Sequence, residues 1–176
     1  TSFDHQVHSL GRWIHYFILE APEEEFESHS GCPAHLYPSL EKARKAFNEN
    51  SDYLRLINES KREVTLVWKD SLLEGEAKAR LDILHKNFVL DLKCIRGGYE
   101  LKSFDLKLKK MAWPIQAWWY QRAVREVLDL DLETGFMVLD TQTWRVRTQM
   151  LTKQDLEKAS NQARESIRKL KRWSFV

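Results

Sequence analysis

Two aspartates and a lysine on neighbouring predicted strands are the residues of this chain that could do chemistry. Segments 79–84 and 88–94 alternate apolar and polar residues, as half-buried strands do. Asp82 lies in the first segment, and Asp91 and Lys93 share one face of the second. Mg²⁺ binds carboxylate oxygens together with water and substrate phosphate. The spacing therefore indicates side chains that could hold a divalent metal beside a phosphodiester.

The register of the predicted hairpin brings the two acids together. Residues 86 and 87 suit a two-residue turn, which would place His85 opposite Phe88. The same register would place Asp82 opposite Asp91, with their Cβ atoms roughly 5 Å apart. Like charges directly across a strand pair are destabilising. Such a pair must therefore be solvated or neutralised by a cation.

An ordinary salt-bridged surface is the alternative interpretation of this hairpin. Arg80 and Asp82 of the first strand would then form an exposed face with Asp91 and Lys93 of the second, while the apolar residues between them faced the core. An Asp-x-Lys sequence on a strand is common by chance. A short motif is only a hypothesis until its structural context is known.

The composition is that of one globular, soluble domain. The chain has 176 residues, 43% hydrophobic and 31% charged, which is enough for one well-packed core and too little for two. A net charge of +2 says little about partners, because a nucleic-acid enzyme needs local positive charge. Cys32 and Cys94 are too few for a disulfide framework, so free thiols are expected. There is no apolar run of about 18 residues and no secretory leader.

Hydrophobic periodicity predicts helices and strands in alternation. Ser39 resembles a helix N-cap, and Pro114 suits the first turn of a helix. The predicted helices cover residues 3–21, 39–59 with a break near 48–51, 103–111, 114–128 and 152 onward, and the predicted strands cover residues 62–69, 79–84, 88–94, 135–139 and 144–151. This order predicts an α/β or α+β fold, a single domain with a central mixed β-sheet flanked by helices.

Five sequence blocks, in order and at suitable spacing, resemble a known family. They are GRWIHYFILE at 11–20, EVTLVW at 63–68, KARLD at 78–82, VLDLK at 89–93 and QAWWY at 116–120. The blocks resemble the PD-(D/E)XK nuclease superfamily, and within it the RecE-type recombination exonucleases of phages and prophages, which are relatives of lambda exonuclease. The resemblance implies a restriction-endonuclease-like core, with residues 1–176 as one nuclease domain.

Three features depart from the family pattern. Leu81 replaces the usual proline. Asp91 stands where many superfamily members have glutamate, although aspartate is the form that this branch uses. The longer N-terminal region that the resemblance leads us to expect is absent, and the chain begins at Thr1, so an N-terminal segment could be missing.

The resemblance implies a metal centre. Asp82, Asp91 and the backbone carbonyl of Leu92 would bind one or two Mg²⁺ or Mn²⁺ ions, which two-metal sites hold about 3.5–4 Å apart. His15 would be an additional ligand, although a lone histidine on an apolar helix is more often a core or boundary residue. Glu63 would be an outer ligand or would support the inner ones.

The resemblance also implies roles for three further side chains. Lys93 would lower the pKa of the attacking water or stabilise negative charge developing on the phosphate. Gln116 would orient the water or hold Lys93, and Tyr120, one helical turn further on, would contact phosphate or support Gln116. The alternative is an amphipathic helix whose Trp118, Trp119 and Tyr120 simply pack the core.

Lysines between the second strand of the hairpin and the Gln116 helix are predicted DNA contacts, with a solvated lysine face as the alternative. They are Lys102, Lys107, Lys109 and Lys110. Contacts of lysines to the phosphate backbone are independent of sequence and sensitive to salt.

The resemblance implies a metal-dependent exonuclease that digests duplex DNA from 5′ to 3′ and exposes single strands for recombination, in the cytoplasm of a bacterial or phage-infected cell. It also implies a ring-like homo-oligomer around the DNA and a single-strand annealing protein as partner. The rivals are an endonuclease or a flap or single-strand nuclease on the same core, a catalytically silent DNA-binding module, and a protein-interaction domain whose acidic pairs are incidental.

Overall fold

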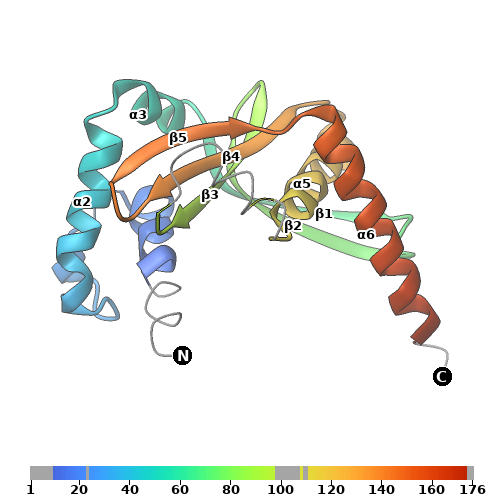
Figure 1. Cartoon of the computed structure of the whole chain (residues 1–176), viewed down its shortest axis with the longest axis horizontal. Helices are drawn as coiled ribbons and strands as arrows, with labels where there is room; N and C mark the ends of the chain where they lie inside the picture. The colour runs from blue at the N-terminus through green and yellow to red at the C-terminus, as the bar shows by residue number, and fades with distance from the viewer. Residues whose placement is uncertain (1–9, 23, 98–107, 109–110, 174–176) are drawn as a thin grey trace.

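A five-stranded mixed sheet lies at the centre of the protein, in a computed structural model that describes residues 10–22, 24–97, 108 and 111–173. The strands, in their order across the sheet, are β1 (Lys61–Asp70), β2 (Gly75–Leu84), β3 (Phe88–Ile95), β4 (Glu133–Asp140) and β5 (Arg145–Met150). Neighbouring strands are antiparallel except β3 and β4, which are parallel. Between these two strands the chain passes through helix α5 (Trp113–Leu128), as Figure 1 shows, because a parallel pair needs a crossover connection.

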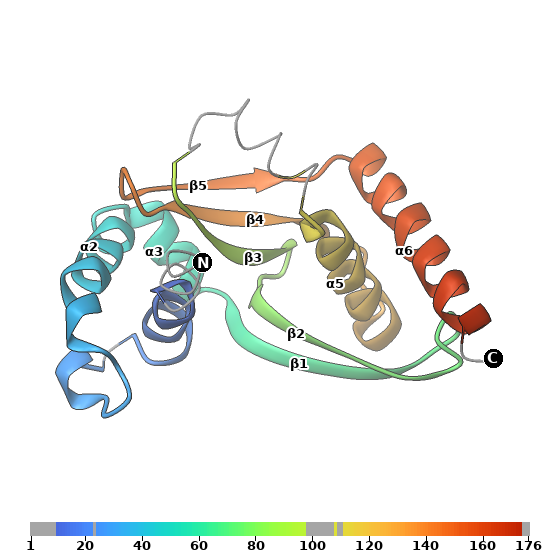
Figure 2. The ribbon, with the colours of Figure 1, turned by 60° about the horizontal axis from the view of Figure 1, so that its bottom comes forward.

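Helices cover both faces of the sheet (Figure 2). One layer begins with residues 10–15, which continue into the π-helical turn η1 (Tyr16–Glu20), and we call these together the N-terminal helix. The same layer contains the short helices η2 (Phe26–Ser28) and η3 (Ala34–Leu36) and the α-helices α2 (Tyr37–Asn48) and α3 (Ser51–Asn58). Phe17 and Phe47 of this layer share a core with Leu92 of β3. Helices α5 and α6 (Lys153–Trp173) form the other layer, where Trp118 and Ala159 pack with Phe136 of β4. Since both faces are covered, most of β3 and β4 is buried.

β1 and β2 form a long ribbon whose apolar side chains pack on α5. At one end of the ribbon Asp70 ties it to this helix. Asp70 Oδ2 accepts hydrogen bonds from Arg122 Nε at 2.6 Å and from Trp68 Nε1 at 2.9 Å. Its Oδ1 accepts the backbone N–H groups of residues 72 and 73 at 2.8 and 2.9 Å. The carboxylate of Asp70 is therefore fully hydrogen-bonded within the protein.

The predicted register of the β2–β3 hairpin is confirmed. Ile83 pairs with Leu90, and His85 N donates a hydrogen bond to Phe88 O at 3.0 Å. The described ladder between these strands ends at the pair of Ile83 and Leu90. Asp82 and Asp91 are the next residues away from the turn, and they lie where β2 and β3 separate.

The fold class is as predicted, and so is the helix that begins around Pro114. The prediction that Ser39 caps a helix is wrong, because α2 begins at Tyr37 and accommodates Pro38 in its first turn, where proline needs no N–H partner. Both cysteines are free thiols. Residues 3–9 of the first predicted helix and nearly all of the predicted helix 103–111 lie outside the described residues. Among the helices that are described, none combines the length and apolar composition that a membrane crossing requires.

Candidate metal centre

The N-terminal helix carries His15 to the backbone of β3. Ile14 is fully buried in the core beneath this helix. Gly11 lies so close to β3 that a Cβ atom there would stand 3.7 Å from the Cβ of Cys94. This close packing places His15 Nε2 2.6 Å from the carbonyl oxygen of Leu92. A helix and a strand that are far apart in the sequence thus bring a nitrogen and an oxygen ligand atom to one point.

Glu63 interrupts the β1–β2 ladder opposite Asp82. The residue pairs on either side of this position are formed, but Glu63 and Asp82 do not pair, and Glu63 has a φ angle of 54°. A residue with a Cβ rarely adopts this left-handed conformation, and such strain clusters at functional sites. His15, Glu63 and Asp82 each offer one ligand atom, and these atoms lie within 4.8 Å of one another.

Burial shifts the pKa values of these three side chains toward their neutral forms. Desolvation, reinforced by the charge of Asp91, raises the pKa of Asp82 to about 8. Desolvation also raises the pKa of Glu63 and lowers the pKa of His15. Neutral imidazole is the form that binds metal, and a bound cation favours ionised carboxylates. The electrostatics of the cluster therefore suit a cation.

Asp91 holds the ammonium group of Lys93 at the edge of the cluster. Lys93 Nζ lies 2.5 Å from Asp91 Oδ2 in a buried ion pair. Lys93 Nζ also donates to Gln116 Oε1 at 2.8 Å, and Gln116 Nε2 donates to the Tyr120 hydroxyl at 2.8 Å. These contacts connect β3 to α5. They fix the position of the ammonium group next to a buried carboxylate.

The structure places Tyr120 both in the core and in contact with Gln116, and its role in catalysis stays a prediction. Its ring is buried and packs in the core between the β1–β2 ribbon and α5. Its hydroxyl receives the hydrogen bond from Gln116. Desolvation and the charges of Asp91 and Asp82 raise the pKa of Tyr120, so the hydroxyl keeps its proton.

The cluster opens into a cleft of about 580 Å³. Glu63, Asp82 and Tyr120 line it together with the aromatic side chains of the N-terminal helix. Arg80 bridges two acids at its border, contacting Glu63 through Nε and Glu20 Oε2 at 3.1 Å through Nη2. This cleft is large enough to admit part of a substrate to the cluster.

The donor set fits a hard divalent cation. Carboxylate and carbonyl oxygens with one imidazole nitrogen suit Mg²⁺ or Mn²⁺, although these atoms alone do not select one metal. Of the four predicted ligands, the structure gathers His15, Asp82 and the Leu92 carbonyl, since Asp82 Oδ2 lies 3.6 Å from His15 Nε2 and accepts the Leu92 N–H at 2.8 Å. Glu63 completes this group. Asp91 lies beside Lys93, so its role as a ligand stays a prediction.

The surface interpretation of the hairpin is wrong for both aspartates. Asp82 is 7% exposed and Asp91 is 1% exposed, because helices cover both faces of the sheet at this point. The predicted DNA contacts cannot be placed in the same way. Lys102, Lys107, Lys109 and Lys110 all lie outside the described residues.

Sequence reasoning missed the Glu20–Arg80–Glu63 bridge. A signal was present for Arg80, because strand alternation places it on the same side of β2 as Asp82. The Leu-Glu that ends the block 11–20 contains Glu20. Nothing in the sequence indicated that these side chains would meet across the cleft.

Known proteins support the nuclease-like architecture. The fold is similar to the crystal structure of a candidate exonuclease from Eubacterium rectale, with a TM-score of 0.76 and 16% sequence identity over 94% of this chain and 66% of that chain. The chain thus spans about two thirds of that protein. No curated protein matches the chain. The family model of the PDDEXK-like domain of unknown function (DUF3799) matches residues 4–174, and the chain therefore belongs to this family.

Proposed function

We propose that this protein is a metal-dependent deoxyribonuclease that hydrolyses duplex DNA, as a 5′-to-3′ exonuclease of the RecE type. The observation that carries the proposal is the burial of Asp82 and Asp91 at the point where β2 and β3 separate, with the Lys93 ammonium 2.5 Å from Asp91. Burying two neighbouring carboxylates lowers the stability of the folded protein unless a cation binds between them. A cation held by these carboxylates, with an ammonium group beside them, suits a phosphodiester.

His15, Glu63, Asp82, Asp91 and the Leu92 carbonyl are the groups that would hold the metal. When bound, Mg²⁺ or Mn²⁺ supplies Lewis-acid polarisation of the phosphate and a water of lowered pKa. The protein keeps this region largely free of bulk water, because both aspartates are buried. Charge interactions inside such a region are stronger than in bulk water.

Lys93 would stabilise the charge that develops on the phosphate, and Gln116 would hold it in place. The hydrogen bond from Lys93 Nζ to Gln116 Oε1 supports this arrangement, because it removes the rotational freedom of a long side chain. Tyr120 supports Gln116 in turn through the 2.8 Å hydrogen bond to its hydroxyl. Electrostatic groups that are fixed before the reaction cost no reorganisation during it.

A processive exonuclease of this type would act as a ring-like homo-oligomer that encloses DNA. A single-strand annealing protein would then receive the exposed strand. These two partners follow from the family resemblance and are part of the proposal. The oligomeric state is tested by light scattering of the purified protein, in which a monomer at all concentrations would exclude the ring.

The proposal is tested by incubating the protein with Mg²⁺ and three DNA substrates. Linear duplex should be degraded from its 5′ ends, as a label at either end reports, while covalently closed circular duplex should survive. Cutting of the closed circle would instead identify an endonuclease on the same core. Preference for flaps or single strands would identify the other nuclease rival.

Two substitutions separate an enzyme from a silent DNA-binding module. Asp91→Asn and Lys93→Ala should abolish most hydrolysis and leave DNA binding in place. Lys86→Ala is the matched control, because Lys86 is an exposed lysine at the turn of the same hairpin. If both site variants behave like the control, the protein is not this nuclease.

A further inference from the structure

A second pocket lies on the α2 side of the sheet, between α2, the end of β3 and the β4–β5 turn. Its volume is about 430 Å³. Lys42 of α2, Arg96 after β3, and Gln142 and Trp144 of the turn are among the side chains that line it. We call it the Trp144 pocket. Figure 1 shows the β4–β5 turn beside α2.

We infer that the Trp144 pocket binds an unpaired nucleotide of a single-stranded DNA segment, with the base against Trp144 and the phosphate near Lys42 and Arg96. This inference rests on the proposed function, because it takes DNA as the ligand. It assigns a further site, outside the metal centre, to the strand that the enzyme handles.

The charges of the pocket suit a phosphate. Among the described lining residues Lys42 and Arg96 are cations, and none is an acid. Lys42 Nζ lies over the ring of Trp144, 5.9 Å from its centroid, so a cation already contacts this aromatic ring. Proteins that bind single strands combine these two elements, a positive groove for the backbone and an aromatic ring on which a base stacks.

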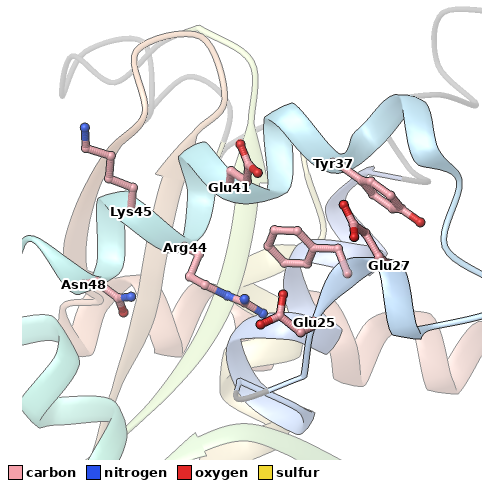
Figure 3. Close-up of a pocket in the computed structure, with 8 residues that line it drawn as sticks. Glu25, Glu27, Tyr37, Glu41, Arg44, Lys45 and Asn48 are labelled. Atoms are coloured by element: carbon pink, nitrogen blue, oxygen red, sulfur yellow. The ribbon is translucent and has the colours of Figure 1, made fainter.

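A neighbouring pocket on another side of α2 has a different set of charged side chains. Glu25, Glu27, Glu41 and Arg44 are among the side chains that line it (Figure 3). The guanidinium of Arg44 is already used, since Nη2 donates to the Glu24 carbonyl at 2.7 Å and the group lies 4.1 Å from the ring centroid of a phenylalanine. Three acids and two basic residues line this acidic pocket, and its net negative charge disfavours phosphate. The two sides of α2 therefore differ in the ligands they could accept.

The walls of the Trp144 pocket are held in place by hydrogen bonds to the Asp140 side chain and to the backbone of Ile95. Asp140 Oδ1 accepts the N–H of Gly97 and the N–H of Gln142, both at 2.9 Å. Thr141 N donates to Ile95 O at 2.7 Å. The end of β3 and the β4–β5 turn are therefore held together. A pocket that exists before binding loses little entropy when the ligand enters.

The pocket lies within a few nucleotides of the metal centre. The N-terminal helix passes Cys94 at Gly11 and reaches Leu92 at His15, four residues later, which is about 6 Å along a helix. Along β3, Cys94 and Arg96 are two and four residues beyond Leu92, which is roughly 7 to 13 Å. At roughly 3.4 Å per stacked nucleotide, this separation along β3 equals the length of about two to four nucleotides.

The ligand must be unpaired, because the bases of a duplex already stack on one another. Trp144 is partly exposed, and part of its ring packs on the core. The part of the ring that is exposed lies under the flexible Lys42 side chain, and a single extruded or unpaired base that displaced this side chain would match it in size. Stacking of this kind tolerates any base, as a nuclease without sequence preference requires.

The test is the affinity for a labelled single-stranded oligonucleotide, measured by fluorescence anisotropy in EDTA so that no DNA is cut. Trp144→Ala should weaken binding about tenfold, Trp144→Phe should retain most of it, and neither should change the affinity for blunt duplex. Lys42→Gln should reduce the slope of log K against log salt by about 0.7. Lys45→Gln, an exposed lysine of α2 that lines the acidic pocket, should match the wild type.

The inference fails if Lys42→Gln behaves like Lys45→Gln, or if Trp144→Ala weakens single-strand and duplex binding equally. Thermal unfolding checks each variant. Should Trp144→Ala not fold, Lys42→Gln decides, because Lys42 is exposed. A wild type that cuts no DNA but binds single strands through Trp144 overturns the proposed function alone. A wild type that cuts DNA while both pocket variants bind normally overturns the pocket alone.

Discussion

The β1–β2 ribbon holds two buried aspartates, and their environments are opposite. Asp70 at one end is 2% exposed and accepts four hydrogen bonds, from two side chains and two backbone N–H groups. Burial alone would raise its pKa, but the hydrogen bonds, led by that of Arg122, lower it overall. Asp82 at the other end is also buried, yet desolvation and Asp91 raise its pKa to about 8.

This difference distinguishes a structural carboxylate from one that is kept for a ligand. Each carboxylate oxygen of Asp70 accepts two hydrogen bonds from within the chain. Asp82 faces a second carboxylate and has fewer donors, which destabilises the metal-free fold. Proteins violate the rules of burial at functional sites and compensate elsewhere. The ribbon illustrates both cases within one element.

The largest expected effect is on catalysis, at the end of the ribbon that carries Asp82. Asp91→Asn and Lys93→Ala should each lower the rate of duplex hydrolysis about a thousandfold, because each removes charge placed next to the reacting phosphate. The measurement is single-turnover hydrolysis of end-labelled linear duplex. A loss of less than tenfold in both variants would show that this end of the ribbon is not a catalytic site.

Breaking the structural end should cost stability and no direct chemistry. Asp70→Ala should lower the free energy of unfolding by about 3 kcal/mol, because Arg122, whose side chain is 14% exposed, loses its buried partner. Urea denaturation measures this. Glu126→Ala is the control, since its 3.4 Å contact with Arg122 is solvent-exposed and should matter by less than about 0.5 kcal/mol. Equal losses in the two variants would contradict the structural role of Asp70.

The pH dependence should reveal the raised pKa of Asp82. This carboxyl has a pKa of about 8 in the folded protein against 3.8 when exposed, so the folded state binds more protons between these values. The metal-free protein should therefore lose stability as pH rises from about 4 to about 8, by at most about 1.4 kcal/mol per pH unit. Urea denaturation in EDTA across this range measures the slope.

Asp82→Asn provides the control for the pH experiment. The variant should be more stable than the wild type near pH 8 and should lack this part of the slope. It should also lose the rise in melting temperature that Mn²⁺ gives the wild type, because a ligand of the folded state raises stability only if it binds. A wild type whose melting temperature ignores Mn²⁺ would argue against the metal centre itself.

The smallest effect is expected for Tyr120→Phe. This change keeps the buried ring and removes only the hydroxyl that supports Gln116, so hydrolysis should fall about fivefold with little change in stability. Gln116→Ala should have the larger effect, because it frees Lys93. The two rates are compared in the same single-turnover assay. If the tyrosine variant is the slower of the two, the hydroxyl acts on the substrate directly.

The sequence predicted the parts of the site that depend on local periodicity. Alternation of period two, with a two-residue turn, determined the β2–β3 register. The resemblance implied that Tyr120, one helical turn beyond Gln116, would contact phosphate or support Gln116. The structure shows a hydrogen bond between these two side chains, and the phosphate contact stays a prediction. The superfamily part of the resemblance is confirmed by the family match, whereas the RecE-type branch stays a proposal.

Features that depend on tertiary packing could not be predicted from the sequence. The φ angle of Glu63 follows from its place opposite Asp82, and no local preference of glutamate predicts it. Strand alternation predicts one face for Leu81 and Ile83, yet Leu81 packs toward α5 and Ile83 toward α2. The strand thus changes helical layers at Asp82. A single strand does not reveal that both of its faces are covered.

The hydrogen bond between His15 and the Leu92 carbonyl has a consequence for how an ion would arrive. His15 Nε2 and the Leu92 carbonyl oxygen, both candidate ligand atoms, lie 2.6 Å apart, and their hydrogen bond anchors the N-terminal helix to the centre of the sheet. Loading would therefore exchange a proton for a cation within a finished scaffold. The backbone should therefore change little when the metal binds, and the circular dichroism spectrum should stay almost the same.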